Sequence, residues 1–323
     1  MKKFTRRWSQ INADFPNSPF VLTRFFRIFI LLFVLSVFAC DFFAQNSVSM
    51  PDNNEWPVIS ASLSSKIASG SIEQKREALF QIRNLQTEQA SRLAVPALTD
   101  SNEIVRATAA SSVIFLPEVE AAAVLISLLR DKAEFVRREA AYALGKVGNA
   151  NAISSLLQTL QKDKILEVRT ASAVALGMIG DASAVPALTT ILQARPREED
   201  EFLRRSAARS IGQIAQIIRT GKRRVLTPQN FLAEKFKNIE SPITGNLIEK
   251  YPVFRASINV LVSTLQNKAE ADDTRREAAF SLGAIGDDSA ISVLRANLTS
   301  DDPYLVEISK EALAKLSPSE PPA

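Results

Sequence analysis

The residue types that most often carry enzyme chemistry are nearly absent from this sequence. Its 323 residues contain no histidine and one cysteine, Cys40. Without histidine, the Ser–His and Cys–His nucleophile systems and histidine-based metal sites are excluded. No GxGxxG or GxxxxGK[ST] phrase for binding phosphates occurs either. We therefore predict a protein that is not an enzyme, with no catalytic residues, no metal and no cofactor.

Cys40 closes a short apolar segment near the N-terminus. Residues 28–40, IFILLFVLSVFAC, are uncharged, and the 27 residues before them carry six Lys or Arg against one Asp. A basic segment, a short apolar run and a small residue are the parts of an export signal. The run is shorter than the roughly 20 residues that a membrane-spanning helix needs. Residues 1–40 are thus predicted to be a signal peptide or membrane anchor, which sends the protein to the cell envelope.

The residues around Cys40 predict a specific modification. Val37 to Cys40 resemble a bacterial lipobox, in which the cysteine is lipidated and becomes the mature N-terminus, although Phe38 departs from the usual small residue. The acyl chains of a lipidated Cys40 would hold the protein at the membrane. Cleavage near Ala39 or Ala44 by an ordinary signal peptidase, and retention of the segment as an anchor, are the alternatives.

The charge of the chain is concentrated in that N-terminal segment. The whole chain carries +4 and its first 27 residues carry +5, which leaves −1 for residues 28–323. A nearly neutral domain is not expected to attract nucleic acid by charge alone, so we predict no nucleic-acid partner. One cysteine also excludes a disulfide within the chain.

A second set of residues with chemical potential is a recurring basic position. It holds Lys75, Arg106, Arg137, Arg169, Arg204 and Arg275, and an acid lies six residues before four of them, at Asp100, Asp131, Asp163 and Glu198. One interpretation is a row of ion pairs that joins adjacent repeats, where single exposed pairs contribute about 0–1 kcal/mol each. The other is a row of cations that binds an anionic ligand. We favour the ion pairs.

The basic position belongs to a repeated phrase that must position it. The phrase starts at Gln74, Val105, Val136, Val168, Leu203, Thr274 and Leu305, with spacings of 31 to 35 residues and one gap of 71. Mostly apolar residues at offsets 0, 4, 8 and 11 mark one face of an α-helix, and glycines such as Gly148 and Gly180 are suited to end it. A second helix follows, and such a hairpin buries its apolar faces only by stacking. The predicted fold is all-α, an α-solenoid of about seven stacked helical hairpins.

The phrases VRREAAYALGKVG, VRTASAVALGMIG, LRRSAARSIGQIA and TRREAAFSLGAIG resemble the HEAT-like repeats of phycocyanobilin lyases and many bacterial scaffold proteins. The resemblance covers roughly residues 58–317 and implies an armadillo-type superhelix. Such repeats serve many unrelated roles, so the resemblance is poor evidence for function. It raises a bilin-lyase-like or other ligand-handling protein as an alternative, which an export signal and the lack of histidine do not favour.

The flanking segments complete the predicted domain organisation. Residues 41–57 are predicted to be a linker, 58–317 the solenoid and 318–323 a disordered tail. An insertion at about 216–254 fills the one long gap between repeats. It begins with a basic cluster, Lys222, Arg223 and Arg224, and is expected to contain a short helix starting at Thr227-Pro228. The insertion is either a second partner contact or a decayed repeat that covers the stack.

The positions that the repeat leaves free are the candidates for binding. The residue six positions after the first residue of each phrase and the residue four further on share a helix face, which the resemblance places on the concave surface. The candidate binding residues at these positions are Phe80, Phe115, Tyr142, Met178, Arg209 and Phe280. They form either a partner-binding stripe or packing between neighbouring repeats. We predict a non-enzymatic protein–protein interaction scaffold of the cell envelope, and a cytoplasmic nucleic-acid-binding solenoid is the third hypothesis.

Overall fold

The computed structural model describes residues 55–223, 227–237 and 247–316. These residues belong to the second of two compact units, Asp52–Ala323. The predicted signal or anchor at 1–40 with Cys40, nearly all of the predicted linker, and the predicted tail lie outside the described residues. Helix α3 begins at Trp56, two residues before the predicted start of the solenoid, and α17 ends at Leu316.

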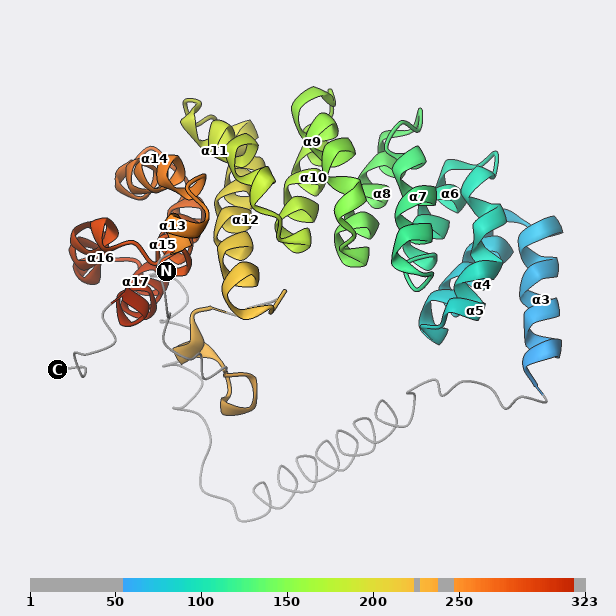
Figure 1. Ribbon diagram of the computed structural model, residues 1–323. Helices are drawn as coiled ribbons and strands as arrows, with labels where there is room; N and C mark the ends of the chain where they lie inside the picture. The colour runs from blue at the N-terminus through green and yellow to red at the C-terminus, as the bar shows by residue number, and fades with distance from the viewer. Residues whose placement is uncertain (1–54, 224–226, 238–246, 317–323) are drawn as a thin grey trace, which may run out of the picture. The chain divides into compact units, whose positions relative to one another are not determined.

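Helical hairpins make up the described part of the chain, which contains no strand. Seven hairpins follow one another, as the repeat predicted (Figure 1). Their paired helices are α3 (Trp56–Ser69) with α4 (Ile72–Leu85), α5 (Glu88–Ala94) with α6 (Glu103–Ser112), α7 (Glu118–Leu128) with α8 (Glu134–Val147), α9 (Ile153–Lys162) with α10 (Leu166–Ile179), α11 (Val185–Gln193) with α12 (Glu201–Thr220), α14 (Phe254–Gln266) with α15 (Asp272–Ile285), and α16 (Ile291–Ala296) with α17 (Pro303–Leu316). The α-solenoid fold is therefore confirmed.

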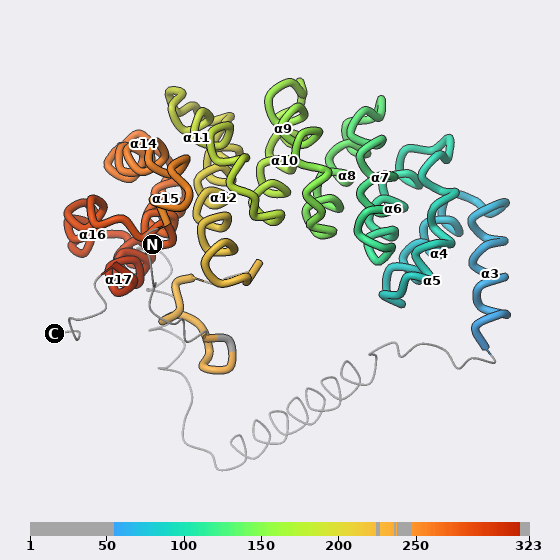
Figure 2. Tube along the Cα trace, viewed as in Figure 1, coloured from blue at the N-terminus to red at the C-terminus, as the bar shows by residue number. Residues whose placement is uncertain are grey.

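The helices form two layers, which the trace in Figure 2 visits in alternation. Layer B contains the second helix of each hairpin, namely α4, α6, α8, α10, α12, α15 and α17, and every copy of the repeated phrase lies in it. Layer A contains the first helices. Neighbouring helices contact each other more extensively in layer B than in layer A. Layer B therefore supplies most of the packing between neighbouring hairpins.

Helix α10 illustrates why this sequence forms tightly packed hairpins. Leu176 is buried, and its carbonyl accepts the N–H of Gly180, which ends the helix at a φ of +83° where glycine is favoured. Small residues set the spacing in layer B, because a Cβ on Gly177 would lie 2.4 Å from Oγ of Ser210 in α12. The close approach of α10 and α12 thus depends on glycine at position 177.

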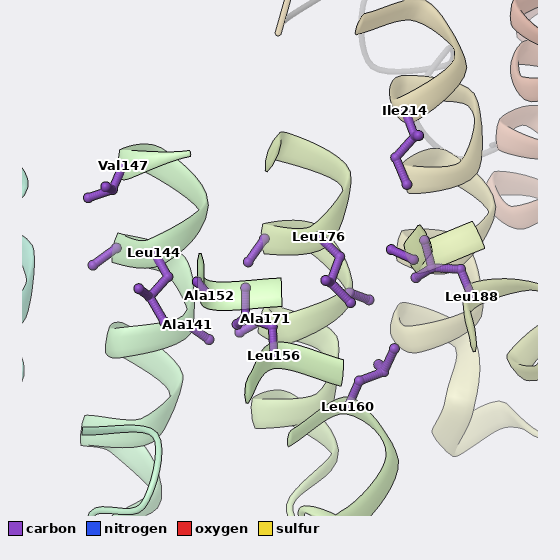
Figure 3. Packing of buried hydrophobic residues seen from close by; sticks show 14 of the residues in the cluster. Ala141, Leu144, Val147, Ala152, Leu156, Leu160, Ala171, Leu176, Leu188 and Ile214 are labelled. Atoms are coloured by element: carbon purple, nitrogen blue, oxygen red, sulfur yellow. The ribbon is translucent and has the colours of Figure 1, made fainter. Parts of the chain in front are cut away.

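The core runs through the whole stack between the two layers. Figure 3 shows Leu144 and Leu176 from layer B beside Leu156 and Leu188 from layer A, and all four are 0–1% exposed. Each hairpin shares this core with its neighbours, so no hairpin is a separate folding unit. Truncating one of these leucines to alanine is expected to cost about 2–5 kcal/mol of stability.

The repeat is interrupted between α12 and α14. Helix α12 continues through 20 residues to Thr220 because Ile217 extends its apolar face and packs on Gly180 at the end of α10. Two 3₁₀ turns, Gln229–Phe231 and Glu234–Phe236, and the short helix α13 (Leu247–Lys250) follow. The prediction of a short helix starting at Thr227-Pro228 is therefore wrong, because the chain forms single 3₁₀ turns there instead.

None of the helices that the structure describes is both long and apolar enough to cross a membrane.

Candidate partner-binding surface

The basic row of the repeated phrase forms ion pairs between hairpins. Each of four cations bonds to an acid of the next hairpin, at Lys75–Asp100 (2.7 Å), Arg106–Asp131 (2.8 Å), Arg137–Asp163 (2.7 Å) and Arg204–Glu270 (2.6 Å). The interpretation of this row as ion pairs joining adjacent repeats is confirmed at these positions. We call these four pairs the ion-pair ladder.

Arg106 shows how one pair of the ladder connects two loops. Its Nε and Nη2 donate to the carboxylate of Asp131 at 2.8 Å each, and its Nη1 donates to the backbone carbonyls of Asp100 and Ser101. The Asp131 carboxylate also accepts the backbone N–H of Ala133. Burial alone would raise the pKa of Asp131, but the hydrogen bond from Arg106, the N–H of Ala133 and the charge of Arg106 outweigh it and lower the pKa below its ordinary value.

Two basic positions depart from the ladder. Arg169 donates its Nε to the carbonyl of Leu160, and Arg275 pairs with Asp272 of its own helix at 3.3 Å. In the last two hairpins the cross-connection moves one residue along α15, where Arg276 bonds to Asp302 of the next hairpin at 2.7 Å. An ion pair therefore still joins these two hairpins, but it is made by Arg276 and not by Arg275.

The residues predicted to form a binding stripe fall into different environments. Phe80 is 38% exposed, and the guanidinium of Arg83 stacks over its ring at 5.0 Å. Tyr142 and Met178 are half-buried, and the sulfur of Met178 lies against Gly145 of the neighbouring helix α8. These three residues lie on layer B helices, as predicted, but only Phe80 is substantially exposed.

Phe280 and Phe115 contradict the predicted stripe. Phe280 is only 4% exposed because its ring packs between α12 and α15, against Gly212, while the guanidinium of Arg209 covers it at 4.2 Å. Arg209 itself pairs with Glu277 at 3.0 Å. Phe115 is half-buried in the turn that follows α6, because this helix already ends at Ser112. Of the two interpretations of these positions, packing between neighbouring repeats holds for Phe280, whereas Phe80 stays exposed and available to a partner.

A second set of exposed apolar side chains lies one residue before the start of the phrase. Four layer B helices carry a large apolar residue there, in the first turn, namely Ile104 (40% exposed), Phe135 (37%), Phe202 (61%) and Tyr304 (49%). A guanidinium stacks over each aromatic ring, with Arg138 over Phe135 at 4.8 Å, Arg205 over Phe202 at 5.4 Å and Arg276 over Tyr304 at 5.2 Å. We call these seven residues the aromatic–arginine row.

Sequence reasoning missed the aromatic–arginine row, although two copies of the phrase signal it. They read Phe-Val-Arg-Arg at residues 135–138 and Phe-Leu-Arg-Arg at residues 202–205. The first arginine of each belongs to the buried ladder, and the second turns to the surface and stacks on the phenylalanine. Two adjacent arginines thus have different roles, which a helical periodicity of about 3.6 residues predicts for consecutive positions.

The predicted basic cluster of the insertion lies at the ends of layer B helices. Lys222 and Arg223 are exposed, and the Arg223 guanidinium lies beside Gly148, so that a Cβ there would be within 2.5 Å of it. The backbone carbonyl of Arg223 accepts a hydrogen bond from the side chain of Gln213. Arg224 lies outside the described residues. Arg223 therefore covers the C-terminal end of α8, where cations are favoured by the helix dipole.

Within the described ranges, no group of three or more His, Cys, Asp or Glu side chains is placed to hold a metal ion. One carboxyl group has an unusual environment. Burial raises the pKa of Glu277, against the opposing charge of Arg209 and its hydrogen bond. Glu277 is bonded to Arg209 in the interface of α12 and α15. The raised pKa of Glu277 therefore results from the packing of two neighbouring hairpins.

Comparison with known families agrees with this geometry. A model of HEAT repeats matches residues 60–145 and 122–212, and a model of the PBS lyase HEAT-like repeat matches residues 274–300. The chain belongs to the HEAT-repeat proteins. The matched stretches lie on both sides of the insertion, so the HEAT repeats continue beyond it. No curated protein matches this HEAT-repeat chain in sequence.

Solved structures with the same repeat fold are only distantly similar. An engineered protein is 20% identical, with 80% of this chain and 68% of that chain covered and a TM-score of 0.49. YibA of E. coli is 19% identical, with 84% and 99% covered and a TM-score of 0.44. The complex of CpcE and CpcF of phycocyanin lyase from Nostoc sp. is 19% identical, with 80% and 94% covered and a TM-score of 0.43. At these identities and TM-scores, no property of those proteins is carried over to this chain.

Proposed function

We propose that this HEAT-repeat protein is a non-enzymatic scaffold that binds a segment of a partner protein along the exposed side of layer B. The observation that carries the proposal is the aromatic–arginine row. Aromatic residues and arginine are the side chains most enriched at protein interfaces and at their energetic centres. Phe202 is 61% exposed although phenylalanine is usually buried, so a partner that covered it would remove apolar surface from water.

The spacing of the row favours an extended segment. Ile104 and Phe135 begin adjacent layer B helices, whereas Phe135 and Phe202 are separated by α10. Packed helices lie about 8–10 Å apart, and an extended chain in the polyproline II conformation rises about 3.1 Å per residue and returns to the same face every third residue. A bound segment would thus place apolar side chains about three residues apart over the first interval and about six apart over the second.

The arginines of the row indicate the charge of that partner. Arg205 pairs with Asp273 at 2.8 Å, and Arg138 contacts Glu139 at 3.3 Å. The Arg205–Asp273 pair is 39% and 41% exposed, and pairs of that kind contribute about 0–1 kcal/mol. A carboxylate of a partner could replace Asp273 at little cost. We therefore propose a partner segment that combines aromatic or aliphatic residues with Asp or Glu.

Site-specific photo-crosslinking in cells tests the proposed surface. A benzophenone amino acid replaces Phe202 in layer B or, as the matched control, Val119 in layer A, which is 64% exposed. We expect a discrete protein adduct from position 202 and none from position 119, with the adduct lost when Arg205 is also changed to Ala. Equal crosslinking from both positions, or none from position 202, would contradict the proposal.

We also propose that the scaffold acts in the cell envelope after export, held at the membrane by its N-terminal segment. The basic residues, the apolar run and Cys40 support this placement. The near-neutral charge of the rest of the chain is consistent with a protein partner and not with a nucleic acid.

A further inference from the structure

Part of the insertion lies along the exposed face of α17, at the C-terminal end of the aromatic–arginine row. The Thr227 hydroxyl donates to the Glu311 carboxylate at 2.5 Å, and the backbone N–H of Gln229 donates to the same carboxylate. The side-chain amide of Asn230 donates to Glu307 at 2.5 Å. One residue later, the ring of Phe231 lies 4.9 Å from the ring of Tyr304.

These contacts follow a regular order. Successive residues of the segment meet Glu311, then Glu307, then Tyr304, so the segment runs antiparallel to α17 along one helix face. The three positions on α17 are seven, four and three residues apart, which is the spacing of one exposed helix face. A backbone N–H, a side-chain amide and an aromatic ring are thus each matched by a group on α17.

Helix α17 differs from the other layer B helices in the charge of this face. The positions that Glu307 and Glu311 occupy hold Arg138 and Tyr142 in α8, and arginines 205 and 209 in α12. Hydrogen bonds from Lys310 and Asn230 lower the pKa of Glu307, so the carboxylate that receives the segment is ionised at neutral pH. The face of α17 therefore selects hydrogen-bond donors, whereas the faces of α8 and α12 select acids.

We propose that the exposed face of α17 is a peptide-binding site, and that residues 227–231 are its internal ligand. The class of external ligand is an extended protein segment in which hydroxyl or amide donors precede an aromatic residue. This inference deepens the proposed function, since α17 and Tyr304 form the last part of the same surface. Partner binding at α17 and release of the insertion are then coupled, because both ligands use Glu307, Glu311 and Tyr304.

The contacts of the segment suit exchange. Phe231 is 53% exposed and Asn230 is exposed, whereas Pro228 is buried, so the segment is anchored at Pro228 and open to solvent at its last two residues. Its occupancy follows from its connection to α12 and α13 within the same chain, since a short tether gives an effective concentration on the order of millimolar. A free segment of the same chemistry must compete with that concentration.

Peptide titration of the full chain tests the inference. The probe is a fluorescent synthetic peptide with the sequence of residues 227–237, TPQNFLAEKFK, followed by anisotropy. It is titrated into the unmodified protein and into an Asn230→Ala/Phe231→Ala variant, in which the internal ligand has lost two contacts. Both substitutions are at exposed residues, and circular dichroism checks that the helices are retained. We expect at least tenfold tighter binding to the variant, on the order expected when an internal competitor is removed.

Two controls identify the site. Adding Glu311→Gln to the variant should abolish the gain, and a peptide with alanine in place of its first phenylalanine should not bind. In the unmodified protein, the amide N–H of Gln229 should be protected from hydrogen exchange, and Glu311→Gln should remove that protection.

The outcomes separate this inference from the proposed function. Equal affinity for the unmodified protein and the variant, or no peptide binding to the variant, overturns the internal ligand. Crosslinking from position 202 depends on α12 and not on the insertion. It would remain positive if only the inference about α17 were wrong, and would fail if the proposed function were wrong.

Discussion

The ion pair between Arg204 and Glu270 offers the sharpest test of how this stack is held together. The two side chains are 3% and 1% exposed, and two hydrogen bonds of 2.8 and 2.6 Å join them. Arg204 also donates to the carbonyls of Ile191, Leu192 and Ala194, which end α11. The pair thus connects α11, α12 and the loop before α15, across the insertion.

Replacing Glu270 by glutamine leaves the guanidinium of Arg204 buried without its counter-charge. Breaking a buried pair in this way costs about 3–5 kcal/mol, a substantial part of the 5–15 kcal/mol that typically stabilises a folded domain. Each 1.4 kcal/mol changes an equilibrium tenfold, so the opening equilibrium of the affected hairpins should rise by roughly a hundred- to several-thousand-fold. Because hairpins in a solenoid contact only their neighbours, we expect the loss in the hairpins from α14 to α17.

Hydrogen exchange measured helix by helix is the appropriate assay, with urea unfolding followed by circular dichroism as a second measurement. Asp273→Asn is the matched control, since Asp273 pairs with Arg205 across the same two helices but is 41% exposed. The control should lose only about 0–1 kcal/mol. If Glu270→Gln and Asp273→Asn have equal effects, or if exchange rises equally in α4 and α17, the reasoning about the buried pair is refuted.

Three further predictions concern other parts of the chain. Because the pKa of Asp131 is lowered in the folded state, its contribution to stability is present above about pH 4 and is lost as the pH falls through the folded-state value; the urea midpoint should drop there, and less so in Asp131→Asn. Gly177→Ala should destabilise the protein by about 1–3 kcal/mol in urea unfolding, since the new Cβ would lie 2.4 Å from Oγ of Ser210. Intact mass and fractionation from cells should show an acyl-modified Cys40 in the membrane fraction, with association lost in Cys40→Ala, whereas a full-length mass in the cytosol would contradict export.

The ladder shows how far the sequence predicts contacts between hairpins. The recurring cation and acid predict ion pairs, and a uniform spacing makes each cation meet an acid 25 or 26 residues later, as for Arg106 and Asp131. Arg204 instead meets Glu270, which is 66 residues later, because the insertion separates two hairpins that are neighbours in space. Spacing along the chain could not predict that partner.

The candidate surface was predictable only in part. That layer B carries exposed aromatic and basic residues follows from the sequences Phe-Val-Arg-Arg at residues 135–138 and Phe-Leu-Arg-Arg at residues 202–205. The burial of Phe280 does not follow, since it depends on the close approach of α12 and α15 at Gly212. Nor does the docking of residues 227–231 on α17, because no periodicity governs a loop.

The sequence by itself determined the all-α solenoid, its seven hairpins and the ion pairs that join them. Each of these is repeated at a fixed spacing, so that local helical geometry and stacking of equal units are sufficient to derive them. The tertiary structure alone decided which ring of each helix is exposed and which acid lies opposite Arg204. It alone also decided where the insertion lies. These features depend on distances between neighbouring helices and on the path of a non-repeating segment, which the order of residues does not encode locally.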